Sequence, residues 1–280
     1  MLSNRADLHC HTNLSDSSLD VENTVLLAAK RGLRSLAITD HDTMGATEEA
    51  VKYGEKYGIE IIEGVEFSTY DYERKRRVHI LAYGVKGNER LKSIYEKTTL
   101  ERTNAGLIML EKLLKLYPNV SKEMLTKYTK GCASIYKQHF THALCDAGYA
   151  KSIFGEDHKR LFNSKNGLAN EPIKYPDVYD VVKACKEEGA VISLAHPFNY
   201  DSKELFEELS KKELINCVEV WHETANEEET AYLYKKAQEY NLIMTGGTDF
   251  HGMYHSVPVP IGSYTTEYSE LEKIKKLINK

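Results

Sequence analysis

The 280-residue sequence lacks any run of about 18 apolar residues, so it contains no candidate for a membrane-spanning helix. Its first residues, MLSNRADLHCH, have no apolar signal core. Its five cysteines are scattered, odd in number and without a CxxC pair, which argues against a disulfide framework. These absences favour a protein of the reducing cytoplasm that has no membrane partner.

The sequence also lacks an excess of basic charge. With 37 Lys and Arg against 42 Asp and Glu, the formal net charge is −5, which argues against a long nucleic acid held by a broad basic surface. Hydrophobic residues make up 41%, enough for a sizeable core. The length fits one barrel-sized domain, or a domain that carries an insertion.

Two stretches of the chain alternate predicted strands and helices. In the first, we expect strands at 5–10, 34–40, 59–67 and 76–85 and helices at 21–32 and 45–58. The strand at 76–85 follows a charged turn and is either a hairpin partner or the next strand. In the second, we expect strands at 190–197, 216–223 and 242–252 and helices at 177–189, 204–212, 227–241 and 269–280. Repeated strand–helix units predict an α/β fold with a parallel sheet, open or closed into a barrel.

Residues 88–172 interrupt this alternation. They show helical spacing at 91–117, 121–130, 135–149 and 156–166, and no convincing strand. We therefore predict a barrel domain formed by residues 1–87 and 173–280, with an inserted helical subdomain at residues 88–172.

Histidines and carboxylates follow the predicted strands. His9 and His11 end the first strand, His41 follows the second, and Glu66 follows the third. His79 lies in or near the fourth strand, and the remaining strand ends carry His196, His222, Asp249 and His251. In a parallel βα barrel the C-terminal strand ends meet at one face, where active sites are built. We therefore expect these residues, which are far apart in the sequence, to lie close together at the C-terminal face of the barrel.

The first motif, HCH, has the spacing of a metal site. Residues i and i+2 of an extended segment point to the same side, so His9 and His11 can hold one ion while Cys10 points into the core. Asp16 offers an oxygen ligand a short loop away, and Glu66 can bridge two ions with its two oxygens. A lone HxH is more often a surface or core feature, so the prediction rests on all these positions together.

Two further motifs, TDHD and TDFH, repeat this chemistry. In TDHD, Asp40 or Asp42 could orient the imidazole of His41. The same motif could instead form a turn and the N-cap of the helix that follows. In TDFH, Asp249 and His251 have the i, i+2 spacing of the HCH motif. The two glycines before them allow the backbone to approach a crowded centre.

These motifs resemble those of the PHP family, named for polymerase and histidinol phosphatase. They are DLHCHTNLSD (Asp7–Asp16), ITDHDT (Ile38–Thr43), GVEFS (Gly64–Ser68), HILAY (His79–Tyr83), AHP (Ala195–Pro197) and GGTDFHG (Gly246–Gly252). The resemblance implies a distorted seven-stranded (β/α) barrel with two or three divalent metal ions. It is strongest to small stand-alone phosphoesterases with a helical insertion, which act on nucleoside 3′,5′-bisphosphates or on the ends of short RNAs.

The resemblance also implies how nine residues would share three ions. One ion would bind His9, His11, Glu66 and Asp249. A second would bind Asp16, His41 and His251. A third would bind Glu66, His79 and His196. The donors are nitrogen and oxygen only, which leaves manganese, zinc and iron open and argues against a thiolate site.

A segment of the helical insertion resembles a family motif near the active site, Ser-x-x-Arg-x-His. It makes Ser134, Lys137 and His139 candidate substrate contacts, although ordinary positions at a helix start explain them equally well. Lys137 stands where the family has arginine, so it offers phosphate a point charge rather than a bidentate fork. Arg102 and Asn104 are weaker candidates, because an exposed charged helix face explains them.

The implied reaction is hydrolysis of a phosphomonoester by metal-activated hydroxide. The implied substrate is a small nucleotide such as a nucleoside 3′,5′-bisphosphate. His222 and Asp40 are the candidate catalytic residues. His222 would be the general acid for the leaving oxygen, or a hydrogen-bond partner of the substrate or of a metal ligand.

Four other functions stay open. A 5′–3′ exoribonuclease could use the helical insertion as one wall of a groove for short oligonucleotides. A histidinol-phosphate-type phosphatase fits less well, because the more His-rich first motif of that branch is absent. An amidohydrolase also begins with HxH, but usually needs a metal-bridging lysine that no strand end supplies here. A non-catalytic metal-binding module would not require the complete ligand set.

Overall fold

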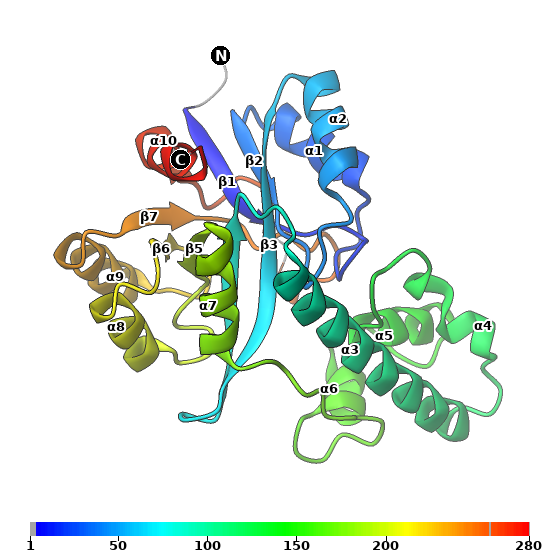
Figure 1. Ribbon diagram of the computed structural model, residues 1–280. Coiled ribbons are helices and arrows are strands. Elements are labelled where there is room, and N and C mark those ends of the chain that lie inside the picture. The colour runs from blue at the N-terminus through cyan, green and yellow to red at the C-terminus, as the bar shows by residue number, and fades with distance from the viewer. Residues whose placement is uncertain (1–3, 258, 280) are drawn as a thin grey trace.

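A curled sheet of eight strands forms the centre of the molecule (Figure 1). The computed structural model describes residues 4–257 and 259–279, and the strand order is β7-β6-β5-β4-β3-β2-β1-β8. The strands are β1 (Arg5–Cys10), β2 (Ser35–Ile38), β3 (Glu60–Asp71), β4 (Arg76–Tyr83), β5 (Val191–Leu194), β6 (Cys217–Trp221), β7 (Ile243–Gly246) and β8 (Thr266–Glu267). The predicted distorted barrel is confirmed, and the two-residue β8 adds to its seven predicted strands.

The strand β4 departs from the predicted parallel sheet. It runs antiparallel to both neighbours, β3 and β5, whereas the other pairs among β1–β7 are parallel. The reason is the short β3–β4 connection, which has no room for a crossover helix. In this turn Asp71 accepts hydrogen bonds from the backbone N–H groups of Glu73 and Arg74, and Lys75 has a φ of 55°. Of the two arrangements predicted for residues 76–85, the hairpin is therefore the one that forms.

The two ends of the sheet approach each other where β1 meets β7. β8 pairs antiparallel with β1, and Thr266 Oγ1 in β8 accepts a hydrogen bond of 2.8 Å from the backbone N of Gly246 in β7. The next residue, Gly247, lies against His9 so closely that an added Cβ would be 2.2 Å from His9 Cβ. Only glycine fits there. The first and last strand-end motifs are thereby brought side by side.

Six helices surround the barrel (Figure 1): α1 (Val21–Lys30), α2 (Thr47–Tyr57), α7 (Val178–Glu188), α8 (Lys203–Lys211), α9 (Glu227–Glu239) and α10 (Tyr268–Ile278). α7 illustrates how the sequence defines them. Asp177 caps its first turn, Gly189 ends it at a φ of 79°, and its apolar residues pack on the strands beneath. Among the described residues, no helix has both the length and the apolar character needed to cross a bilayer.

The remaining helices gather on one side of the barrel, away from α8, α9 and α10 (Figure 1). They are α3 (Glu89–Leu116), α4 (Lys122–Leu125), η1 (Lys127–Thr129), α5 (Lys137–Asp146) and α6 (Glu156–Phe162). They share an apolar cluster of their own around Met109, Leu113, Phe140 and Leu161, whereas Leu91 at the start of α3 packs in the barrel core. The domain division at residues 88 and 172 stays a prediction. Within the predicted barrel domain, residues 1–3, 258 and 280 lie outside the described part of the chain.

Candidate metal centre

Side chains from several strands converge at one end of the barrel. β1 supplies His9 and leads into His11, β3 supplies Glu66, and β4 supplies His79. Because β4 is antiparallel, His79 reaches the centre from the middle of its strand, paired with Ser68 on β3. The loops after β1, β2, β5 and β7 add the other predicted ligands, Asp16, His41, His196, Asp249 and His251. All nine residues thus come together, while their role as metal ligands stays a prediction.

Glu66 lies fully buried at the middle of this centre. Its Oε2 faces three histidine nitrogens, namely His9 Nε2 at 3.3 Å, His11 Nε2 at 3.2 Å and His41 Nδ1 at 3.0 Å. Its Oε1 faces two more, namely His79 Nδ1 at 2.9 Å and His196 Nε2 at 3.1 Å. The two oxygens therefore face different sets of histidines. A carboxylate that bridges two ions requires this geometry.

The first group joins β1 to the loop after β7. The ligand atoms of His9, His11, Glu66 and Asp249 all lie within 4.8 Å of one another. Asp249 Oδ1 is 3.3 Å from His9 Nε2 and 3.0 Å from His11 Nε2. This is the same set that the family resemblance assigns to one ion.

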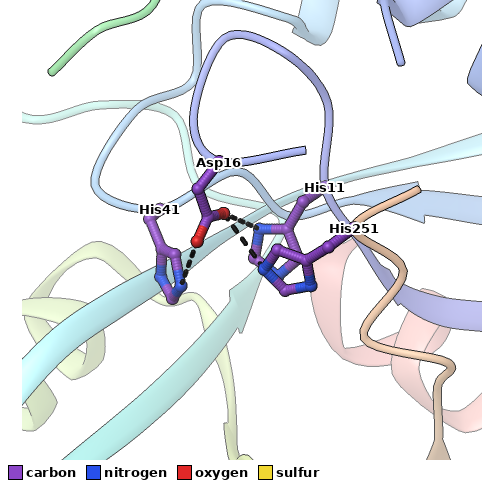
Figure 2. Close-up of side chains that lie close together, drawn as sticks. All are labelled: His11, Asp16, His41 and His251. Atoms are coloured by element: carbon purple, nitrogen blue, oxygen red, sulfur yellow. Dashed lines mark ion pairs between the residues drawn. The ribbon is translucent and has the colours of Figure 1, made fainter. Parts of the chain in front are cut away.

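The second group surrounds Asp16. Its Oδ1 lies 3.0 Å from His251 Nε2 and 3.7 Å from His11 Nδ1, and its Oδ2 lies 3.9 Å from His41 Nε2. Figure 2 shows the carboxylate between His41 on one side and His11 and His251 on the other. Gln138 of α5 donates a hydrogen bond of 3.2 Å to Asp16 Oδ2, so the helical segment also contacts this group.

The third group surrounds Glu66 Oε1. His79 and His196, the predicted partners of Glu66 there, both face this oxygen. The ligand atoms of His41, Glu66 and His79 also lie within 4.8 Å of one another. His41 thus borders both the second group and the third.

The charges of the centre shift the pKa values of its members. Burial raises the pKa of Asp16, but neighbouring histidines, His251 first, outweigh burial and hold that pKa far below its usual range. Burial lowers the pKa of His11, but the carboxylates of Asp249 and Glu66, 3.0 and 3.2 Å from its Nε2, outweigh burial and raise that pKa to about 10. Without metal, a proton on His11 offsets part of the negative charge of these two carboxylates, which a divalent cation would otherwise offset.

Several buried atoms of the centre have no hydrogen-bond partner within the described part of the chain. They are His9 Nε2, both ring nitrogens of His11, Glu66 Oε2, His196 Nδ1, His222 Nε2 and Asp249 Oδ1. Leaving such atoms unpaired costs about 1–3 kcal/mol each. Coordination to cations would remove this cost, so the residues present fit divalent ions with nitrogen and oxygen ligands.

The structure corrects the prediction that Asp40 or Asp42 orients the imidazole of His41. Asp40 instead accepts hydrogen bonds from Thr12 N at 2.7 Å and Thr12 Oγ1 at 2.6 Å, and a third from Ser15 Oγ. It therefore holds the loop that leads to the second group. The ring of His41 faces Glu66 instead. A catalytic role for Asp40 stays a prediction, and its contacts make that role indirect.

The interpretation of Arg102 as part of an exposed charged helix face is wrong. Arg102 is 2% exposed, and its Nη2 donates to Asp42 Oδ2 at 2.6 Å and to Ser68 Oγ at 2.8 Å. Its Nη1 donates to Ser134 Oγ at 3.3 Å. The interior of the long helix α3 is thereby anchored to the loop that follows β2. A single arginine in a helical pattern carries no sequence signal for such a contact.

A cavity of about 710 Å³ lies between the metal centre and the helical segment. Five predicted ligands form part of its wall: Asp16, His41, His79, Asp249 and His251. Three cationic side chains also line it: Arg77, Arg102 and Lys137. The cavity thus borders the metal centre and positive charge at once.

The three predicted substrate contacts lie in different surroundings. Lys137 lines the cavity, and its Nζ donates to Asn170 Oδ1 at 2.7 Å. Ser134 and His139, both in the described part of the chain, are buried and are not in the cavity wall. The backbone N of Tyr136 donates to His139 Nδ1 at 3.4 Å, which caps the start of α5. The helix-start interpretation therefore fits His139, and substrate contact stays a prediction for all three.

Glu219 is a buried member of the centre that sequence reasoning missed. It lies in β6, is 1% exposed, and faces His9 and the backbone of His196. The sequence CVEVW does contain a signal, because one acidic residue among apolar positions of a strand requires a buried partner. His222, the predicted general acid, lies next to it with Nε2 3.6 Å from Asp249 Oδ2.

A family model described as the PHP domain matches residues 7–188, more than half of the chain. The chain belongs to the PHP family. A phosphoribosyl 1,2-cyclic phosphate 1,2-diphosphodiesterase of Eggerthella lenta is 34% identical over 90% of this chain and 96% of the relative. The 5′-3′ exoribonuclease Rnm of Salmonella typhimurium is 27% identical over 88% of this chain and 84% of the relative.

The fold of this PHP protein also matches a solved structure. A proposed metal-dependent phosphoesterase from Bifidobacterium adolescentis superposes with a TM-score of 0.87 at 27% identity, covering 97% of this chain and 96% of the other. The predicted enzyme class is confirmed, and this PHP protein is a hydrolase of phosphate esters. Its barrel carries a cluster of His, Asp and Glu able to bind metal ions. The alternatives of an amidohydrolase and of a non-catalytic module are thereby set aside.

Proposed function

We propose that this PHP protein hydrolyses a phosphate ester of a small ribose-based substrate that carries a second phosphate group. The observation that supports this most is a cavity of about 710 Å³ that has predicted metal ligands in one part of its wall and Lys137 and Arg77 in another. That volume is typical of pockets for one small molecule. One phosphate would lie at the metal centre and the second would lie near the two cations.

Lys137 and Arg77 are close enough to influence each other. Burial, and then the charge of Arg77, lower the pKa of Lys137 to about 8. Arg77 lies over the rings of Tyr200 and Tyr175, with centroid distances of 5.3 and 5.8 Å. Neither cation forms an ion pair with a carboxylate of the described residues, so the two together favour a doubly charged anion, which would relieve their repulsion.

The residues of the metal centre would divide the reaction between them. Divalent manganese, zinc or iron, when bound, would polarise the phosphate and lower the pKa of a bound water. His9, His11, Glu66 and Asp249 would hold the ions closest to β1. His222 would donate a proton from Nε2 to the leaving oxygen, since that atom is buried and has no hydrogen-bond partner among the described residues.

The names of the relatives narrow the substrate class. The Eggerthella lenta relative is named for phosphoribosyl 1,2-cyclic phosphate, a ribose with two phosphate groups. A nucleoside 3′,5′-bisphosphate, the substrate that the family resemblance implies, has the same feature. The second candidate function is trimming of short RNA from the 5′ end, which the name of the Salmonella relative favours. The size of the cavity favours the small molecules over RNA.

A substrate panel tests the proposal. Product release would be measured with manganese or zinc on phosphoribosyl 1,2-cyclic phosphate, a nucleoside 3′,5′-bisphosphate, a short 5′-phosphorylated RNA, histidinol phosphate and 4-nitrophenyl phosphate. We expect kcat/KM to be highest for a ribose compound with two phosphate groups, and Lys137→Ala to reduce it selectively there. Equal kcat/KM on singly phosphorylated compounds would contradict the proposal. Faster turnover of RNA would favour the exoribonuclease instead.

A further inference from the structure

The carboxylate of Glu219 contacts two predicted ligands, one in β1 and one in the loop after β5. Its Oε1 and Oε2 lie 3.1 and 3.3 Å from His9 Nδ1. Its Oε2 also accepts a hydrogen bond of 2.9 Å from the backbone N of His196. His9 belongs to the first group of ligands and His196 to the third, so one side chain touches both.

The strand β6 points this carboxylate into the barrel. Val218 and Val220 lie in the core beneath the helices, whereas Cys217 lies in the apolar cluster inside the barrel. Because side chains alternate along a strand, Glu219 shares the inner face with Cys217. Its Oε2 accepts from His196 N at 2.9 Å, and its two oxygens lie 3.1 and 3.3 Å from His9 Nδ1, contacts that suit an ionised carboxylate.

The contact with His9 determines which ring nitrogen carries the proton. An ionised carboxylate can only accept, so His9 Nδ1 must donate to Glu219. In the neutral ring, which metal binding requires, His9 Nε2 then carries no hydrogen, and it faces Glu66 Oε2 and Asp249 Oδ1, each at 3.3 Å. A histidine in this tautomer presents a lone pair to the place where the ligand atoms meet, as carboxylate–histidine–metal arrangements do.

The contact with His196 holds a strained backbone. His196 has a φ of 26°, in the left-handed region that residues other than glycine rarely adopt. Such a conformation costs about 1–3 kcal/mol and persists only where neighbouring contacts support it. The hydrogen bond from His196 N to Glu219 is such a support, and it directs His196 Nε2 toward Glu66 Oε1.

We propose that Glu219 is a positioning residue that sets the affinity of the metal centre, by orienting His9 and His196 together. The inference rests on the proposed metal-dependent function and deepens it. Glu219 does not itself bind an ion in this proposal, because both its oxygens face N–H donors. Removing its charge should loosen two groups of ligands at once and leave the fold in place.

The test measures Mn²⁺ binding to the full chain by titration against a competing chelator. We expect Glu219→Gln to bind Mn²⁺ about 10–100-fold more weakly than the wild type, the usual effect of losing a carboxylate behind a histidine ligand. Glu219→Asp, which keeps the charge but shortens the reach, should lie between the two. Turnover of 4-nitrophenyl phosphate by Glu219→Gln should recover as Mn²⁺ is raised, which a purely structural defect would not show.

Asp71→Asn is the matched control, because Asp71 is another buried strand carboxylate, 1% exposed, whose partners are Glu73 and Arg74. It should leave Mn²⁺ affinity unchanged. The inference is overturned if Glu219→Gln binds Mn²⁺ as tightly as the wild type, or if Asp71→Asn loses as much affinity. If the wild type itself binds no Mn²⁺, Zn²⁺ or Fe²⁺, the proposed function fails and the inference falls with it.

Discussion

Arg102 and Asp42 form an ion pair that is sealed from solvent. The 2.6 Å contact between Arg102 Nη2 and Asp42 Oδ2 joins the long helix α3 to the loop after β2, and the two side chains are 3% and 0% exposed. Asp42 has a φ of 53° and also accepts a hydrogen bond of 3.0 Å from Ser68 N. The pair therefore secures the helical segment to the backbone next to His41.

Breaking this pair from one side should destabilise the fold. Arg102→Met leaves the Asp42 carboxylate buried without its cation, and we expect the free energy of unfolding to fall by about 3–5 kcal/mol. Urea unfolding followed by circular dichroism measures the change. The double variant Arg102→Gln with Asp42→Asn removes both charges and should recover most of the loss.

An ion pair on the same helix provides the control. Arg90 pairs with Glu187, and the two side chains are 40% and 45% exposed. Arg90→Gln should change the free energy of unfolding by less than about 1 kcal/mol, because solvent screens exposed pairs. Equal losses in Arg90→Gln and Arg102→Met would contradict the importance of burial.

Removing Asp249 should remove both metal and activity. Asp249 Oδ1 faces His9 and His11, so Asp249→Asn replaces a charged predicted ligand of the first group by a neutral side chain. We expect fewer bound ions by elemental analysis and loss of phosphate release. The control is Asp201→Asn, since the side chain of Asp201 is 86% exposed. Full turnover by metal-depleted Asp249→Asn would refute metal-assisted hydrolysis.

Lys137 should make substrate affinity depend on pH. Its pKa is lowered to about 8 by burial and by Arg77, so the side chain is charged below that pH and neutral above it. An anionic second phosphate should therefore bind more weakly, with a higher KM, as the pH rises through about 8. Lys137→Arg stays charged and should flatten this rise. A KM that rises equally in both proteins would exclude Lys137 as its cause.

His222 should matter most for substrates with poor leaving groups. If His222 donates a proton to the leaving oxygen, His222→Asn should lower kcat about 10²–10⁴-fold on an alkyl phosphate. The loss should be much smaller on 4-nitrophenyl phosphate, because nitrophenolate leaves without a proton. His142→Asn, a change in the helical segment where His142 stacks on Tyr128, is the control. Equal losses on both substrates would assign His222 to binding rather than to acid catalysis.

Much of the centre was predictable because its residues stand at strand ends in short, regular motifs. The i, i+2 spacing of His9 and His11 was sufficient to predict that they face one place, since side chains alternate along an extended chain. The place of His79 was harder to derive. Its contribution depends on β4 being antiparallel, which a short turn after Asp71 decides.

The hydrogen-bond partners of several polar residues could not be predicted from the sequence. Asp40 stands next to His41 in the sequence, yet its hydrogen bonds go to Thr12 across the neighbouring loop. In the sequence, nothing distinguishes Arg102 from other charged residues of a helix, because its burial depends on how α3 packs against the barrel. Adjacency in a motif carries little information on hydrogen bonding when the backbone turns at that point, as the φ of 53° at Asp42 shows.

The sequence by itself determined the family, the alternation of strands and helices and the set of nitrogen and oxygen donors, because these depend on local periodicity and on residue type. Only the tertiary structure decided that Glu66 faces different histidines with each oxygen, that Glu219 contacts His9, and that Lys137 lines the cavity. These contacts join residues far apart in the chain. They arise from strand register, barrel closure and helix packing, which no single segment specifies.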